Sequence, residues 1–128
     1  MSDYKIANLK QIEDSAHAFG YAPDMEARFG RKPLEAERSG ISYQRLAPNF
    51  RGPFGHRHAE QEETYVVVSG SGRVKLEDGV HELEQWDAVR VAPQTGRGFE
   101  AGPEGMELLV FGAGPSGEAE LLHDWWGE

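Results

Sequence analysis

The sequence predicts an all-β fold in which many short strands form a sandwich or a closed barrel. The chain has 128 residues, which is enough for one domain with a single hydrophobic core. Its 16 glycines and 7 prolines are typical of a chain in which tight turns separate short strands. Apolar and β-branched runs recur between these turns at nearly regular spacing, as in sandwiches and barrels.

The first 40 residues show no clear periodicity, and we expect an irregular extension that packs on the main body. Within it, the segment 24–30 predicts a short helix that is capped by Asp24 and stopped by Gly30. The first clear strand is expected at 41–46, because its apolar run ends before Pro48.

Most of the strands are expected in the central part of the chain. The predicted strands are 62–68, 73–76, 80–83, 88–91, 97–101 and 106–112, and turns are predicted at 69–72, 77–79 and 102–105. An apolar tail that should dock on the body consists of Leu121, Leu122, Trp125 and Trp126. The single domain is thus divided into an extension (1–40), a barrel (41–112) and a C-terminal tail (113–128).

Composition excludes several classes of function. A formal charge of −9 would repel a phosphate backbone, so we expect no nucleic-acid partner. The absence of cysteine excludes disulfides and thiolate metal ligands. No apolar run is long enough to span a membrane, and the N-terminus lacks the pattern of a signal peptide. We therefore expect a cytoplasmic protein without a membrane partner.

The segment around residue 60 carries a pattern typical of a metal site on a β-sheet. His56 and His58 stand two residues apart, so their side chains point the same way on an extended chain. Glu63 follows on a β-branched strand; Glu62 is the alternative carboxylate but should face the other side. Two imidazoles and one carboxylate suit Fe, Mn, Ni or Zn and leave coordination positions open. Alternatively, these side chains only satisfy one another in a polar interior.

The pattern His56-x-His58-x4-Glu63-x6-Gly70 resembles the first motif of the cupin family. The leading glycine of that motif lies further upstream in the family than the nearest glycines do here. The resemblance covers roughly residues 41–112. It implies a single jelly-roll β-barrel, here with an irregular or short-helical N-terminal extension. It also implies a metal held inside the barrel by two histidines, the glutamate and a third histidine.

The second cupin motif is only partly present. Asp87 and Pro93 keep its frame, whereas its second glycine is replaced by Gln94. The third histidine is missing, and Arg97 occupies its position. A guanidinium stays charged, and at ~5 Å from a divalent ion it would be repelled by roughly 6–7 kcal/mol at an effective dielectric constant of about 20.

Two arrangements of Arg97 follow from this substitution. In the first, Arg97 turns away from a metal at His56, His58 and Glu63 and clamps a substrate carboxylate. In the second, Arg97 pairs with Glu63 and replaces the metal, which leaves a metal-free binding pocket. Tyr65 lies on the same strand face as Glu63, and Phe99 lies on the same strand face as Arg97. We expect both to line the ligand pocket.

The sequence therefore predicts a cupin that binds or converts a small anionic molecule at a divalent-metal site inside the barrel. The alternative is a metal-free cupin that binds a small ligand beside an Arg97–Glu63 pair. A transcriptional regulator is disfavoured, because the first 40 residues show no two-helix pattern with a basic face. We also expect a homodimer, since exposed sheet edges need a cover.

Overall fold

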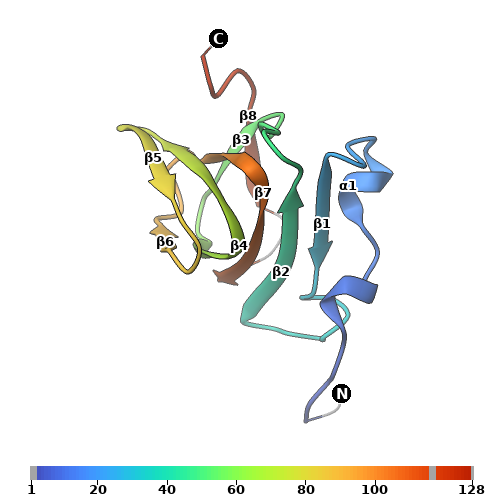
Figure 1. Cartoon of the computed structure of the whole chain (residues 1–128). Coiled ribbons are helices and arrows are strands. Elements are labelled where there is room, and N and C mark those ends of the chain that lie inside the picture. Colours follow the sequence, from blue (N-terminus) through green and yellow to red (C-terminus); the bar gives the residue numbers. More distant parts are fainter. Residues whose placement is uncertain (1–2, 116–117, 128) are drawn as a thin grey trace.

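The computed structural model describes residues 3–115 and 118–127, and most of them belong to β-strands (Figure 1). The main sheet contains β1 (Met25–Phe29), β2 (Ser39–Leu46), β4 (Glu62–Leu76), β5 (Gly79–Leu83), β6 (Ala88–Val91) and β7 (Gly98–Ala113). Its order is β1-β2-β7-β4-β5, with β6 also paired to β4, and all its pairs are antiparallel.

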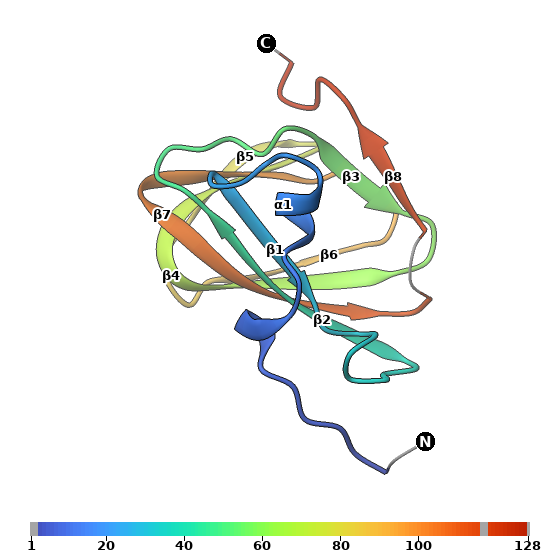
Figure 2. The ribbon, with the colours of Figure 1, turned by 90° about the vertical axis from the view of Figure 1, so that its right-hand side faces the viewer.

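A second sheet consists of β3 (Gly55–His58) and β8 (Ala119–Leu122), which pair antiparallel. Figure 2 shows the strands of both sheets arranged around a common interior. Helical structure among the described residues is restricted to η1 (Leu9–Gln11) and α1 (Ser15–Ala18). The predicted all-β class is confirmed. Neither of these helices is long or apolar enough to cross a membrane.

The helix predicted at 24–30 is wrong, because this segment forms strand β1. β1 pairs with β2 from Met25 opposite Leu46 to Phe29 opposite Ser42. Ala27 is buried in the middle of the strand, so pairing and burial outweigh the weak local signal for a helix. The capping acid lies further upstream: Asp14 accepts the N–H of Ala16 in α1 and also the N–H of Ala27.

The turns predicted at 69–72 and 102–105 are also wrong, because β4 and β7 run through them. Their pairing register shifts between Val67 and Ser69 and again between Gly70 and Gly72, which bends the strands without ending them. A Cβ at Gly70 would lie 2.0 Å from the carbonyl oxygen of Gly105. Gly70 therefore permits the close approach of the β4 and β7 backbones and does not reverse the chain. The predicted hairpin at 77–79 is confirmed as the β4–β5 turn.

The hydrophobic core is built mainly from side chains of the paired strands β4 and β7, with further side chains from β2, β5 and β6. Its buried side chains are Leu46, Tyr65, Val67, Val74, Leu83, Val91, Phe99, Ala101, Met106, Leu108 and Val110. Tyr65 and Phe99, two predicted pocket residues, are therefore part of this core.

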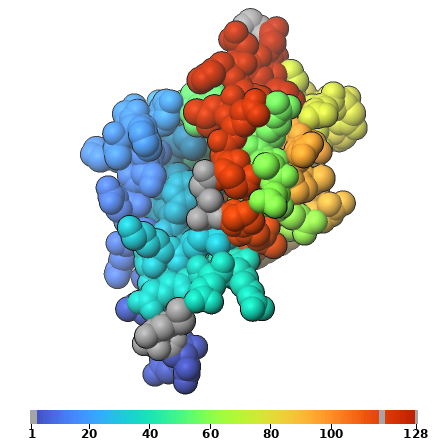
Figure 3. Space-filling model, turned by 180° about the vertical axis from the view of Figure 1, so that it is seen from behind, coloured from blue at the N-terminus to red at the C-terminus, as the bar shows by residue number. Residues whose placement is uncertain are grey.

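The C-terminal segment packs on the strand that carries the two histidines. Trp125 lies against Gly55, Gly96 and Gly98, where an added Cβ would come within 2.7 Å of its ring. Its indole N–H donates to the carbonyl of Lys75 over 2.9 Å. Figure 3 shows this segment (red) on the surface, with the green strands on one side of it and the blue and cyan N-terminal strands on the other. Leu121 of β8 is about half exposed.

The pairing of β1 with β2 is reinforced by Glu26, whose two oxygens accept from the guanidinium groups of Arg28 and Arg45. Burial raises the pKa of the Glu26 carboxyl, but the hydrogen bonds from Arg28 and Arg45 outweigh it, so the pKa lies below its usual value. A carboxyl with a depressed pKa stabilises the fold above its unfolded pKa and loses that contribution as the pH falls through its folded pKa.

We therefore expect Glu26→Gln to lower the free energy of unfolding by about 1 kcal/mol at pH 7. The difference from the wild type should shrink steadily below about pH 4.5, where the wild-type carboxyl begins to gain its proton in the unfolded state. Urea unfolding at several pH values measures this effect. Glu104→Gln, at an exposed glutamate, is the control. A loss that persists unchanged at pH 2 would contradict the assignment.

Candidate metal centre

The two histidines are held in place by backbone contacts on both sides of β3. On one side β3 pairs with β8, so that His56 lies opposite Leu121 and His58 opposite Ala119. On the other side the backbones of His56 and Arg97 exchange two hydrogen bonds of 2.9 and 3.0 Å, and the N–H of His58 donates to the carbonyl of Pro93 over 2.8 Å. The two-residue spacing then places both rings on one side, with centroids 5.1 Å apart.

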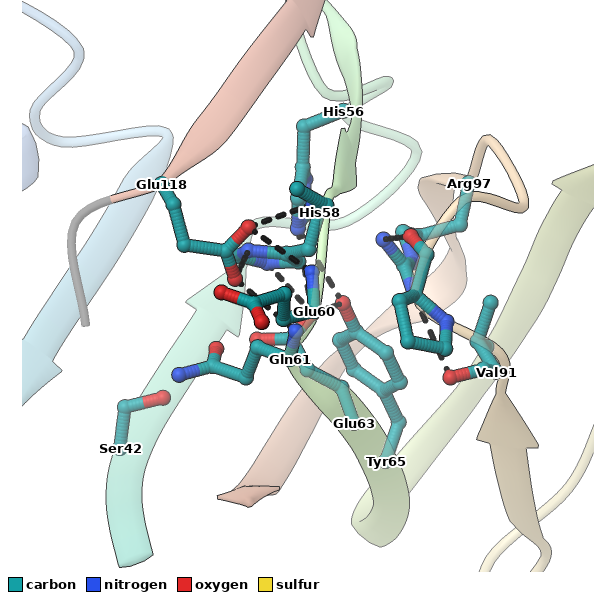
Figure 4. Close-up of polar contacts among 12 residues, drawn as sticks. Ser42, His56, His58, Glu60, Gln61, Glu63, Tyr65, Val91, Arg97 and Glu118 are labelled. Carbon is teal, nitrogen blue, oxygen red and sulfur yellow. Dashed lines mark hydrogen bonds and ion pairs between the residues drawn. The ribbon is translucent and has the colours of Figure 1, made fainter. Parts of the chain in front are cut away.

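Glu63, on β4, brings a carboxylate to both imidazoles (Figure 4). Its Oε1 lies 3.2 Å from Nε2 of His56 and 3.3 Å from Nε2 of His58. The hydroxyl of Tyr65, two residues further along the strand, donates to the same oxygen over 2.5 Å. The ligand atoms of His56, His58 and Glu63 all lie within 4.8 Å of one another. The structure thus brings together the three residues predicted to hold a metal.

The surroundings of His58 fit a metal ligand. Its side chain is 8% exposed, and neither ring nitrogen makes an aligned hydrogen bond, although each lies near a carboxylate. A buried polar atom without a partner is costly and calls for an additional group. A divalent cation beside Nε2 would supply that partner, and two nitrogen donors with one oxygen donor suit Fe, Mn, Ni or Zn.

Electrostatics keep Glu63 in the charged form that a metal ligand requires. Burial raises the pKa of its carboxyl, but hydrogen bonds from His56 and Tyr65 and the nearby imidazoles lower it to about 2. Burial and the charge of Glu63 raise the pKa of the Tyr65 hydroxyl well above its usual value. Tyr65 is therefore a neutral hydrogen-bond donor at the edge of the site.

Sequence reasoning missed Glu118, which lies directly before β8. Its Oε1 is 3.2 Å from Nδ1 of His58, on the opposite side of the ring from Glu63. Glu118 also accepts the backbone N–H groups of Ala59, Glu60 and Gln61. Burial raises the pKa of the Glu118 carboxyl, but these backbone hydrogen bonds outweigh burial, so the pKa lies below its usual value. No local pattern links Glu118 to a histidine 60 positions earlier, so only the fold reveals the contact.

Arg97 turns its guanidinium toward backbone carbonyls and not toward Glu63. Its side chain is fully buried, and its guanidinium donates to the carbonyls of Val91, Ala92 and Pro93 at 3.1–3.5 Å. Figure 4 shows these contacts leading away from the histidines. Among the described residues no carboxylate pairs with Arg97, so the alternative Arg97–Glu63 pair is not formed. The expected clamp of Arg97 on a ligand carboxylate stays a prediction; in the structure its guanidinium faces backbone carbonyls.

All six predicted site residues line one cavity of about 600 Å³. They are His56, His58, Glu63, Tyr65, Arg97 and Phe99. The ring of Phe99 packs on that of Tyr65 with centroids 4.5 Å apart. Much of the remaining wall is apolar and includes Met25, Ala27, Phe29, Ile41, Leu46, Phe54, Leu108, Val110 and Leu121. A cavity of this size can hold a ligand next to the histidine and carboxylate cluster.

The sequence profile of the Cupin domain matches residues 42–112, which is more than half of the chain. This protein therefore belongs to the cupin family. Comparison with curated protein sequences gives no significant match.

Solved structures with a similar fold include other cupins and two kinds of enzyme. A cupin protein from Bacteroides fragilis is 21% identical, with a TM-score of 0.72 over 91% of this chain and 88% of that one. The polyketide cyclase RemF from Streptomyces resistomycificus is 22% identical, with a TM-score of 0.73 over 93% of this chain and 84% of that one. A variant of oxalate decarboxylase from Bacillus subtilis is 20% identical, with a TM-score of 0.79 over all of this chain. The chain spans only 34% of the decarboxylase. At these identities the likeness shows the fold.

The contact between Glu118 and His58 predicts that Glu118 supports metal binding. Glu118→Gln keeps one acceptor oxygen for the backbone N–H groups of Ala59 and Glu60, but it removes the charge beside Nδ1 of His58 and the acceptor for the N–H of Gln61. Loss of such a carboxylate typically weakens metal affinity about 10–100-fold. Titration with Co²⁺, followed by its absorption spectrum, measures the change. Glu120→Gln, on the same segment but paired with exposed Arg57, is the matched control. Equal affinities for both variants would show that Glu118 does not hold His58.

Proposed function

We propose that this cupin holds a divalent metal inside a jelly-roll barrel and binds a small anionic molecule at that metal. The observation that carries the proposal is the convergence of two imidazole nitrogens on one carboxylate oxygen, with His58 buried and without an aligned hydrogen bond. A site that only satisfied its own polar groups would align this buried imidazole for hydrogen bonds with the carboxylates that lie 3.2–3.3 Å from its nitrogens.

His56, His58 and Glu63 would be the protein ligands, with coordination positions left for water or the bound molecule. A bound divalent metal would supply Lewis acidity that polarises an oxygen of this molecule. Glu63 then acts as a ligand and not as a general base. Tyr65 directs a neutral hydroxyl at the same oxygen cluster, and Phe99 supports the Tyr65 ring from the core. Glu118 holds His58 from the outer side of its ring.

The charges at the site favour an anionic ligand. Two neutral imidazoles and one carboxylate leave a divalent ion with one net positive charge. Glu118 adds a negative charge beside His58, and the buried guanidinium of Arg97 offsets it. An anionic oxygen would neutralise the remainder, and the low local dielectric inside the cavity strengthens that attraction.

The similar structures do not extend this proposal to a reaction, since a decarboxylase and a polyketide cyclase share the fold. The homodimer, the cytoplasmic location and the division into extension, barrel and tail also stay predictions.

Metal analysis of the purified protein tests the proposal most directly. We expect about one divalent ion per chain after reconstitution with Fe, Mn, Ni or Zn in turn. His58→Ala should lose this metal, because it removes one of three protein ligands. His81→Ala is the matched control, since His81 lies on an exposed hairpin and pairs with Asp78. If the wild type binds none of these metals stoichiometrically, the metal-dependent function is wrong.

Replacement of Arg97 tests the electrostatic part of the proposal. Arg97→Met keeps much of the buried volume but removes the positive charge. Metal affinity should rise, because a repulsive charge is lost, while the affinity of the metal-loaded protein for acetate should fall about tenfold. Calorimetric titrations with metal and then with acetate measure both. A decrease in both affinities would indicate that Arg97 acts only through the structure.

A further inference from the structure

We infer that the ligand is an amphipathic monoanion, with a single anionic head at the metal and an apolar body in the rest of the cavity. This inference rests on the proposed function and adds the chemical class of the ligand. It excludes a compact dianion as the preferred molecule.

The size of the cavity is the first argument. About 600 Å³ lies within the range of sites that hold drug-sized molecules. The metal cluster occupies only one part of the lining, since its residues come from β3 and β4. A molecule consisting of little more than carboxylates would leave most of this volume without contacts, which forfeits the binding energy of close packing.

The character of the other walls is the second argument. β1, β2 and β7 turn apolar side chains to the cavity, among them Ala27, Leu46, Leu108 and Val110. Apart from Arg31, the polar side chains elsewhere on the wall are uncharged and include Ser42 and Gln61. An apolar body would remove these walls from water, and that burial contributes affinity in proportion to its area.

The engagement of the cavity's cationic side chains by backbone carbonyls is the third argument. Among the described residues that line the cavity, the only lysine or arginine side chains are those of Arg31 and Arg97. Arg31 donates to the carbonyls of Gly114 and Glu37, and Arg97 donates to the carbonyls at the end of β6. To pair with Arg31 or Arg97, a second carboxylate would have to displace these backbone carbonyls. Otherwise it would lie against apolar walls without a counterion, and burial of an unpaired charge opposes binding strongly.

A series of straight-chain acids tests the inference on the metal-loaded protein. Acetate, butyrate, hexanoate and octanoate share one head, so their affinities report the apolar body alone. We expect the affinity, measured by calorimetry, to rise by up to about fourfold for each added methylene. Octanedioate differs from octanoate only in its second carboxylate and should bind at least about tenfold more weakly.

Two variants locate the apolar body. Ala27→Leu adds bulk to the cavity wall and should weaken octanoate about tenfold while leaving butyrate within about twofold. Ala88→Leu places the same change on an exposed position of β6 and should alter neither. Thermal unfolding of both variants shows whether they fold.

The outcomes separate this inference from the proposed function. Affinity that is flat along the series, or octanedioate that binds as tightly as octanoate, would overturn the inference while metal binding persists. Absence of stoichiometric metal, measured before any acid is added, would overturn the proposed function and the inference with it.

Discussion

The site depends on the position of β3, a strand of only four residues that lies outside the main sheet. Both histidines belong to this strand, and short strands have few hydrogen bonds of their own. β3 is fixed by β8 on one side and by the backbones of Pro93 and Arg97 on the other. Trp125 closes this arrangement, because its ring lies where the side chains of Gly55, Gly96 and Gly98 would otherwise be. Geometry at the histidines is thus set by backbone contacts and one partly buried indole.

Much of the site could be predicted from the sequence because its residues are close together in the chain. The spacing of His56 and His58 and the alternation of β4 suffice to place the imidazoles and Glu63 on the inner side. Glu118 could not be found in this way, since its approach to His58 depends on the pairing of β8 with β3. The orientation of Arg97 could not be predicted either, because the carbonyls that accept its hydrogen bonds are brought near the guanidinium only by the fold.

The errors in the predicted fold have the same physical origin. Glycine-rich segments usually indicate turns, yet Gly70 and Gly72 lie within continuous β4, where β7 approaches closely. The segment 24–30 has a local helix signal, but pairing with β2 and burial of Ala27 stabilise it as a strand. In both cases a long-range contact decides between local alternatives of similar energy. The hairpin at 77–79 was predictable because its signal and its structure are both local.

The C-terminal segment lies beyond the 42–112 region that defines the family, yet it touches a histidine of the candidate centre. A substitution near residue 118 can therefore adjust the basicity and orientation of a ligand while the ligands themselves stay unchanged. Divergence near residue 118 would then alter the surroundings of the candidate centre in small steps and leave the main sheet unchanged. Substitutions outside residues 42–112 can thus change the environment of the candidate centre before His56, His58 or Glu63 is replaced.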